Sequence, residues 1–211
     1  MIQHNLTLHS VFPCPVYNVK RDSNLTPEEE KEIGTIVKEG MKWISGLLQQ
    51  ANDTYIFDTK LKNLKEFIEQ HIKNYVKEII NPKKELDFYI TQSWLNVIKP
   101  GGNVQQHSHA NSIISGVFYI STGEGDKITF TDPNIKLKEM IKFKNEEYNL
   151  WNSTYWSLPS KNNELMLFPS WLNHQVIPNE KATTDRISIS FNTFVKGTFG
   201  ERAGLTELIL K

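Results

Sequence analysis

The spacing of apolar positions changes near residue 82, from a helical period before it to short alternating runs after it. Apolar residues recur every three or four positions from about Thr26 to about Gln50, which predicts one amphipathic helix there. Thr26, Pro27 and Glu29 have the spacing of a helix start with a capping box. The apolar face of this predicted helix consists of Ile33, Ile36, Val37, Met41, Ile44, Leu47 and Leu48.

A second helix is predicted from about Lys60 to Ile80 by the same period. Asn81-Pro82 should end it, because the residue before a proline avoids the helical region. His71 lies in the middle of this segment with no partner at ligand spacing, so we interpret it as a structural residue. We expect both helices to pack on a sheet.

After Pro82 the chain consists of short β-like runs separated by turn sequences such as Pro100-Gly101-Gly102. The runs are residues 87–98, 105–109, 114–121, 127–131, 146–157, 164–168, 174–178 and 185–196. Short strands in this number, following two helices, favour an antiparallel double-sheet barrel. The expected fold class is therefore mainly β with flanking helices, with a double-stranded β-helix (jelly-roll, cupin-like) core preceded by two α-helices.

The length suits a single domain, residues 1–211. Within it we expect an N-terminal arm and supporting helices (1–82), the jelly-roll core (83–197) and a C-terminal tail (198–211). Residues 7–19 alternate and contain prolines, which is typical of an edge strand or an extended arm. The tail is predicted to form a final helical turn or a subunit contact, so a homodimer is an open prediction.

Composition limits the classes of partner. Apolar residues make up 38% of the chain, with five Trp and eleven Phe, which is enough for a sizeable core. The 24 basic and 24 acidic residues cancel, so nucleic acid is not indicated as a partner and neither is a membrane surface. Cys14 is the single cysteine, and no apolar run reaches the length of a membrane helix. The first residues lack the pattern of a signal peptide, and we expect a cytoplasmic protein.

Three histidines carry the candidate chemistry. His107 and His109 are two residues apart, so on a strand both side chains lie on the same face and can converge on one ion. His174 opens a later strand, which in a jelly roll can lie across the barrel from the first pair. Imidazole suits iron, zinc, copper or nickel, so residue type alone does not choose the metal.

A cation follows on the next strand. Arg186 and Ser188 share one face of the alternating run RISISFNTF. A guanidinium inside a barrel is costly unless it meets an anion, and its fork matches a carboxylate. An exposed arginine on an edge strand is the alternative interpretation.

Together these motifs resemble those of the Fe(II)/2-oxoglutarate-dependent oxygenases, in which H-x-acid is followed by a distant histidine and then by R-x-S. The segments HSHANSIISGVFYIS, ITFTDP, LMLFPSWLNHQVIPN and DRISISFN are similar, in this order, to a bacterial and phage subgroup of this family. The strong resemblance extends from Trp94 to Thr193. It implies an oxidoreductase with Fe(II) as cofactor and 2-oxoglutarate as co-substrate.

The resemblance also implies roles for single residues. His107 and His174 match iron ligands, which are also the catalytic positions of the family. Arg186 matches the residue that grips the distal carboxylate of 2-oxoglutarate, with Ser188 in support, and Tyr119 matches a position from which related enzymes reach the same group. The implied reaction consumes O₂ and couples decarboxylation of 2-oxoglutarate to succinate with hydroxylation of a substrate that the sequence does not identify.

The chain departs from the family pattern at His109, where an acid is usual. A third histidine leaves the metal site one charge more positive than an acid does. Other interpretations make His109 the first ligand with Asn111 in the acid's place, or bring in Asp126 or Asp132. We prefer the three histidines as metal ligands.

Two further functions are compatible with these residues. The half-motifs around the histidines resemble those of cupins, so a three-histidine metal dioxygenase that does not use 2-oxoglutarate is one alternative. A non-catalytic jelly-roll binding protein is the other. Arg186, Ser188 and the two N-terminal helices favour the oxygenase.

The surroundings of the motif supply weaker candidates. The loop Pro133–Asn152 is predicted to be a lid or a substrate contact, because barrel function concentrates on loops. Its lysines, Lys136, Lys138, Lys142 and Lys144, are offset by glutamates, so its charge does not indicate an anionic substrate. Candidate residues for the pocket walls and the substrate side are Trp94, Asn103, Gln105, Gln106, Phe168, Trp171 and Asn192.

Overall fold

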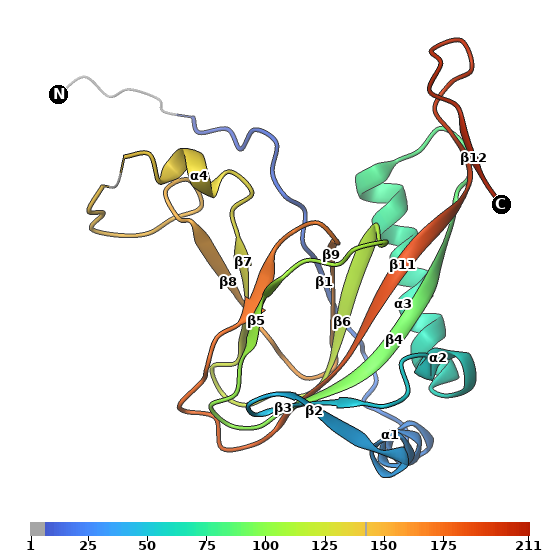
Figure 1. The fold of residues 1–211 in the computed structure, drawn as a ribbon, viewed down its shortest axis with the longest axis vertical. Coiled ribbons are helices and arrows are strands. Elements are labelled where there is room, and N and C mark those ends of the chain that lie inside the picture. Colours follow the sequence, from blue (N-terminus) through green and yellow to red (C-terminus); the bar gives the residue numbers. More distant parts are fainter. Residues whose placement is uncertain (1–6, 142) are drawn as a thin grey trace.

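The structure is a computed structural model that describes residues 7–141 and 143–211. Two antiparallel sheets face each other across a barrel (Figure 1). The larger sheet has the order β1-β9-β6-β11-β4-β3-β2, with β12 added to β11, and the smaller has the order β5-β10-β7-β8. The larger sheet consists of β1 (Tyr17–Lys20), β9 (Glu164–Pro169), β6 (Ile114–Ser121), β11 (Arg186–Phe199), β4 (Asp87–Ile98), β3 (Leu48–Ala51), β2 (Met41–Ser45) and β12 (Leu208–Leu210). The smaller consists of β5 (Val104–His107), β10 (His174–Val176), β7 (Lys127–Thr131) and β8 (Tyr155–Pro159).

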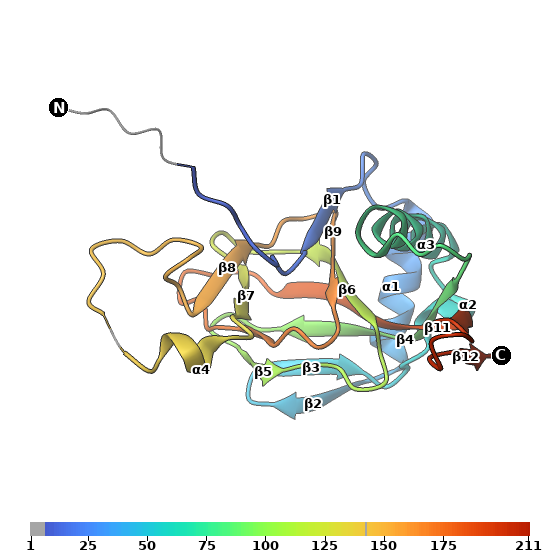
Figure 2. The same ribbon diagram turned by 90° about the horizontal axis from the view of Figure 1, so that it is seen from above.

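Helices cover the outer face of the larger sheet, on the side away from the smaller one (Figures 1 and 2). They are α1 (Pro27–Glu39), α2 (Ile56–Thr59) and α3 (Lys62–Tyr75), which continues as the π-helical turn η1 (Val76–Ile80). A fourth short helix, α4 (Ile135–Lys138), lies in the loop after β7. The predicted fold class, a double-stranded β-helix core preceded by helices, is confirmed. No helix among the described residues is long and apolar enough to span a membrane.

Alternation along the strands gives the larger sheet two different faces. Ile189 and Phe191 of β11 are fully buried among the helices, in the same cluster as Leu64 and Ile68 of α3. The residues between them on β11 face the barrel instead. A second, smaller cluster fills the barrel and consists of Val117, Tyr119, Ile128, Phe130, Met166, Phe168 and Leu172. The site therefore rests on a sheet that is held from behind by an apolar core.

Gly116, the third residue of β6, shows how tightly the helical face is packed. A Cβ atom added there would lie 2.2 Å from Cζ of Phe191 and 2.7 Å from Cδ2 of Leu167. Glycine at this position lets the Phe191 ring lie against the backbone of the neighbouring strand.

The prediction of one helix from Thr26 to Gln50 is wrong beyond residue 39. The capping box at Thr26 and Glu29 is present, but α1 ends at Glu39 and Gly40 takes φ = 126°. The remaining residues form the hairpin β2–β3, and Leu48 of β3 pairs with Ile98 of β4. Hydrogen bonding to the sheet edge outweighs the local helical period, because the apolar residues of this segment are also good strand formers. The second predicted helix is confirmed as α3 with η1, which ends at Asn81.

Most predicted strands are confirmed, and three segments differ. Of the predicted run 146–157, only its last residues belong to β8, because the preceding asparagines form turns of the backbone. The tail forms strand β12 against β11 rather than a helical turn. Of residues 7–19, only the last three join β1, which pairs with β9 at the edge of the sheet.

Candidate active site

The strand pairing brings the three predicted histidines together. His107 ends β5 and lies directly opposite His174, the first residue of the antiparallel neighbour β10. His109 follows in the turn after β5, with its ring centroid 5.1 Å from that of His107 and 5.2 Å from that of His174. One nitrogen of each ring lies within 4.8 Å of the others, so the three rings could hold one ion.

Backbone carbonyls fix the orientation of two of these rings. Nδ1 of His107 lies 2.8 Å from the carbonyl oxygen of Gln105, and Nδ1 of His174 lies 3.0 Å from that of Leu172. A carbonyl only accepts, so Nδ1 carries the proton in both rings and Nε2 presents a lone pair. Metal-bound histidines are commonly oriented by this kind of partner.

Burial keeps two of the rings neutral. It lowers the pKa of His174 to about 3, with a smaller contribution from the neighbouring His107 and His109. It likewise lowers the pKa of His109 to about 4, again with the charge of His107 as the lesser cause. Imidazole binds metal only when it is deprotonated, so these two residues are ready to act as ligands at neutral pH.

The donor set fits a divalent transition metal. Nε2 of His109 and Nε2 of His174 are 3.3 Å apart. Two nitrogens that each lie about 2.1 Å from one ion are about 3 Å apart when the angle between them is about 90°. Three imidazole nitrogens favour iron, zinc, copper or nickel over magnesium or calcium, which prefer oxygen.

Neither aspartate suggested as a replacement ligand belongs to this group. Asp126 accepts hydrogen bonds from the backbone N–H of Gly123 and from Nδ2 of Asn179. Asp132 is paired with Lys138. Both carboxylates therefore have partners elsewhere.

Arg186 lies at the other end of the same pocket. Its side chain is buried, with Nη1 donating to the carbonyl of Lys127 at 2.8 Å and Nη2 donating to the hydroxyl of Tyr119 at 3.3 Å. Its Nε has no hydrogen-bond partner, and none of the ion pairs among the described residues includes it. A buried cation with an unused donor calls for an anionic ligand, and a carboxylate matches the guanidinium fork.

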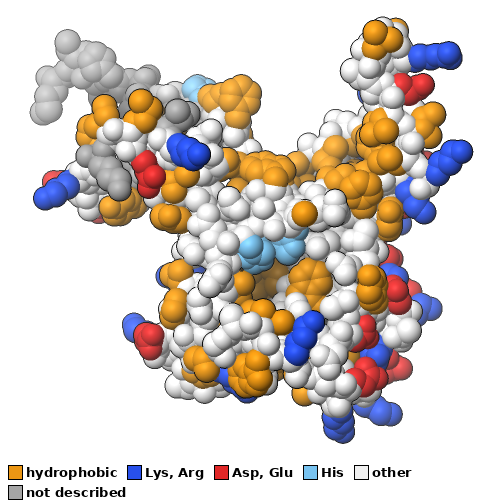
Figure 3. Space-filling model, in the orientation of Figure 1, with side chains coloured by type: hydrophobic (Ala, Val, Ile, Leu, Met, Phe, Trp, Pro, Cys, Tyr) orange, Lys and Arg blue, Asp and Glu red, His pale blue; other side chains and the backbone are white. Residues whose placement is uncertain are grey.

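One pocket of about 290 Å³ connects the histidines to Arg186. In the space-filling view, histidine side chains are exposed at a hollow near the centre of the molecule (Figure 3). Tyr119, Ser188, Asn96 and Gln50 lie side by side on four neighbouring strands and line this pocket. The row leads from the guanidinium to strand β3.

Asn96 and Gln50 are two polar pocket residues that the sequence analysis missed. Asn96 donates from Nδ2 to Oγ of Ser190 at 3.1 Å. Alternation within β4 is the signal that places Asn96 on the same face as Trp94. Gln50 was assigned to a helix, and only the pairing of β3 with β4 brings it to the pocket.

The other candidates divide into two groups. Trp94, whose ring centroid lies 6.1 Å from that of His109, and Phe168, at 4.7 Å from His174, both line the pocket. The pocket lining does not include four exposed candidates, Asn103, Gln105, Gln106 and Trp171. Asn192 lies outside the pocket lining and accepts a hydrogen bond from Ser115.

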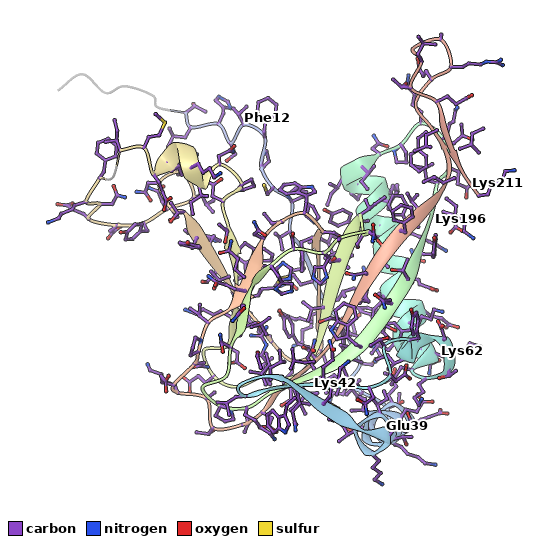
Figure 4. All side chains as sticks on the ribbon, viewed as in Figure 1. Phe12, Glu39, Lys42, Lys62, Lys196 and Lys211 are labelled. Carbon is purple, nitrogen blue, oxygen red and sulfur yellow. The ribbon has the colours of Figure 1, made fainter. Side chains whose placement is uncertain are left out.

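The loop after β7 walls a different and larger cavity, of about 500 Å³. Its other walls are β7, β8 and the N-terminal segment around Phe12, which is labelled in Figure 4. The described residues of Pro133–Asn152 do not line the histidine pocket, so they supply no direct wall to it, and Lys142 lies outside the described residues.

Three imidazoles that could hold a metal ion and a buried arginine therefore lie together inside a double-stranded β-helix. Residues 92–192 match the sequence model of a family described as "Putative 2OG-Fe(II) oxygenase". The matched segment includes the three histidines and Arg186, and through it the chain is similar to the 2OG-Fe(II) oxygenases, a family of oxidoreductases. No curated protein matches the sequence significantly.

Solved structures of this family have the same fold. A prolyl-4-hydroxylase from Pseudomonas putida is 13% identical, with a TM-score of 0.55 and coverage of 87% of this chain and 94% of that one. A prolyl hydroxylase from Trichoplax adhaerens, in complex with a hypoxia inducible factor peptide fragment, is 13% identical with a TM-score of 0.58, covering 85% and 83%. HygX from Streptomyces hygroscopicus, with nickel and 2-oxoglutarate bound, is 8% identical with a TM-score of 0.57, covering 85% and 82%.

Proposed function

We propose that His107, His109 and His174 hold Fe(II) and that Arg186, Tyr119 and Ser188 bind the distal carboxylate of 2-oxoglutarate, so that the protein works as a dioxygenase. The observation that carries the proposal is the buried guanidinium, which has an unused donor and lies in the same pocket as the three imidazoles. A cupin-type dioxygenase that does not use 2-oxoglutarate has no need of this cation.

With Fe(II) and 2-oxoglutarate bound, the site supplies an oxidation in which one atom of O₂ enters succinate, the other enters the substrate as a hydroxyl group, and CO₂ leaves. The side chains of this chain provide binding and orientation. Tyr119 holds the guanidinium in place through its hydroxyl and its ring, whose centroid is 5.0 Å from Cζ of Arg186. Phe168 and Trp94 flank the histidines and limit the access of water.

The substrate end of the pocket carries no charge. Once the histidines and Arg186 are assigned, the remaining lining residues are neutral, and they include Gln50, Asn96 and Trp94. Because an unpaired charge is costly to bring into such a pocket, we propose that the group to be oxidised is uncharged. The two carboxamides offer both donors and acceptors to it.

Succinate formation in the presence of Fe(II), 2-oxoglutarate and O₂ tests the proposal. It should be measured with matched neutral and charged compounds, for example N-acetyl amino-acid amides beside the corresponding free amino acids. We expect neutral members to raise the rate above that of 2-oxoglutarate alone, and the replacement Asn96→Ala to reduce that increase. Stimulation by charged members only would contradict the neutral substrate, while no succinate under any condition would contradict the oxygenase.

We propose two further properties that are independent of the chemistry. The hairpin formed by β11 and β12 exposes Leu205, Leu208 and Ile209, which supports a homodimer through this projection. The mass in solution, with and without Leu208→Asp, tests this. The single cysteine, Cys14, forms no disulfide and supports a cytoplasmic location, which fractionation of cells that make the protein would test.

A further inference from the structure

Three serine hydroxyls lie in contact beside the metal site. Ser115 and Ser170 are 1% and 0% exposed, and Ser112 is half-buried next to them. Oγ of Ser170 lies 2.7 Å from Oγ of Ser112 and 2.8 Å from Oγ of Ser115. The three residues come from the turn after His109, from β6, and from the turn that precedes His174.

The partner of Ser115 sets the direction of the hydrogen bonds at one end of this group. Ser115 donates to Oδ1 of Asn192 at 2.9 Å, so its oxygen is free to accept from Ser170. Ser170 then has only lone pairs left for Ser112, whose proton is shared between Oγ of Ser170 at 2.7 Å and the carbonyl oxygen of Ile114 at 3.3 Å. Oγ of Ser112 in turn accepts from the backbone N–H of Thr193 at 3.3 Å. The result is a hydrogen-bonded chain that links Thr193, through the three serines, to Asn192.

The middle member, Ser170, also joins the two histidine segments through its backbone. Its carbonyl accepts from the N–H of His109 at 2.9 Å, and its N–H donates to the carbonyl of Ile113 at 3.0 Å. The turn that carries His109 and the turn that leads to His174 are therefore locked at one residue. Both ends of the hydroxyl chain lie on β11, so the lock is anchored to the larger sheet.

We infer that Ser170 is a positioning residue for the metal centre: its hydroxyl, held between Ser112 and Ser115, sets the distance between His109 and His174. The inference rests on the proposed metal site. Hydrogen-bond partners that orient metal ligands affect metal affinity by about 10- to 100-fold when they are removed. A buried hydroxyl that only stabilises the fold leaves metal affinity unchanged.

The replacement Ser170→Ala tests this, because it removes the hydroxyl and keeps both backbone hydrogen bonds. Co(II) serves as the probe, since its visible spectrum reports ligand geometry. We expect Ser170→Ala to bind Co(II) about tenfold more weakly than the unsubstituted protein and with an altered spectrum. Ser115→Ala, which breaks the next link, should have a similar effect, and the double variant should lose little more than either single one.

Ser93→Ala is the matched control. Ser93 is 1% exposed and its Oγ accepts from the backbone N–H of Phe57 at 3.0 Å, so its removal also costs a buried hydroxyl hydrogen bond, but at α2 on the outer face of the sheet. It should lower thermal stability and leave Co(II) binding unchanged. The inference alone would be overturned if Ser170→Ala had the same Co(II) affinity and spectrum as the unsubstituted protein. If Ser170→Ala does not fold, Ser115→Ala takes its place in this comparison. No Co(II) binding by the unsubstituted protein would overturn the proposed metal site as well.

Discussion

The two faces of the larger sheet are built by the same strands and have opposite properties. On β11, Ile189 and Phe191 enter an apolar core behind helices α1 and α3, while Arg186, Ser188 and Ser190 line the metal pocket. The apolar face gains stability from burial, and the polar face holds unpaired groups whose burial costs free energy. The comparison shows how a barrel can carry a buried cation and neutral histidines: the face behind it supplies the stability that these groups cost.

Replacing one histidine on each face should give the largest difference, which is in Co(II) affinity. We expect His174→Ala to weaken Co(II) binding by more than about 100-fold, because it removes a ligand rather than a partner of a ligand. His71, which is hydrogen-bonded to the hydroxyl of Tyr17 at 2.8 Å on the helical face, is the matched control. Calorimetric titration should find normal affinity in His71→Ala; a comparable loss there would mean that the histidine pocket is not the metal site.

A large truncation on the helical face should act on stability alone. Phe191 is fully buried beside Gly116, so Phe191→Ala is expected to lower the free energy of unfolding by about 3–5 kcal/mol. Urea denaturation measures this change, and Co(II) titration of the folded variant should give an unchanged affinity. A loss of less than about 1 kcal/mol would contradict the view that this face supplies the stability.

Replacement of Arg186, at the far end of the pocket, should weaken the binding of 2-oxoglutarate and leave the affinity for the metal unchanged. Arg186→Gln loses charge-assisted hydrogen bonds worth about 1.5–3 kcal/mol, so we expect about 10- to 100-fold weaker binding of 2-oxoglutarate. Because the replaced charge is buried and unpaired, the free energy of unfolding should be unchanged or higher. Titration of 2-oxoglutarate into the Co(II) form measures the first change. Unaltered affinity would exclude Arg186 as the carboxylate ligand.

The smallest expected effect is on the pH dependence of stability. In the metal-free protein, burial lowers the pKa of His174 to about 3 and that of His109 to about 4. The unfolded chain takes up protons near pH 6.5 while these folded residues stay neutral, so stability falls as the pH drops from about 6.5 towards about 4. Thermal unfolding between pH 7 and 4 should therefore show a weaker dependence for His174→Ala than for the unsubstituted protein. Parallel curves would mean that His174 is not held neutral.

How well the sequence predicts the structure differs from element to element. Strands β4, β6 and β7 were predicted with their observed bounds, because alternation and turn residues are local signals. Two predictions were wrong, namely the helix extended to Gln50 and the helical turn in the tail. Both segments pair instead with strands far away in sequence, which no local period records. His107, His109, His174 and Arg186 are identifiable from spacing, whereas Gln50 and Ser170 reach the site only through register and turn geometry.

The central claim is that one pocket binds Fe(II) and 2-oxoglutarate together. Its most direct test is the visible spectrum of the protein with Fe(II) and 2-oxoglutarate in the absence of oxygen, recorded beside the variant Arg186→Gln. We predict a charge-transfer band from 2-oxoglutarate bound to the iron, which in the variant appears only at much higher 2-oxoglutarate concentration. Bound Fe(II) without such a band at any 2-oxoglutarate concentration would contradict the claim and favour a dioxygenase of the cupin type.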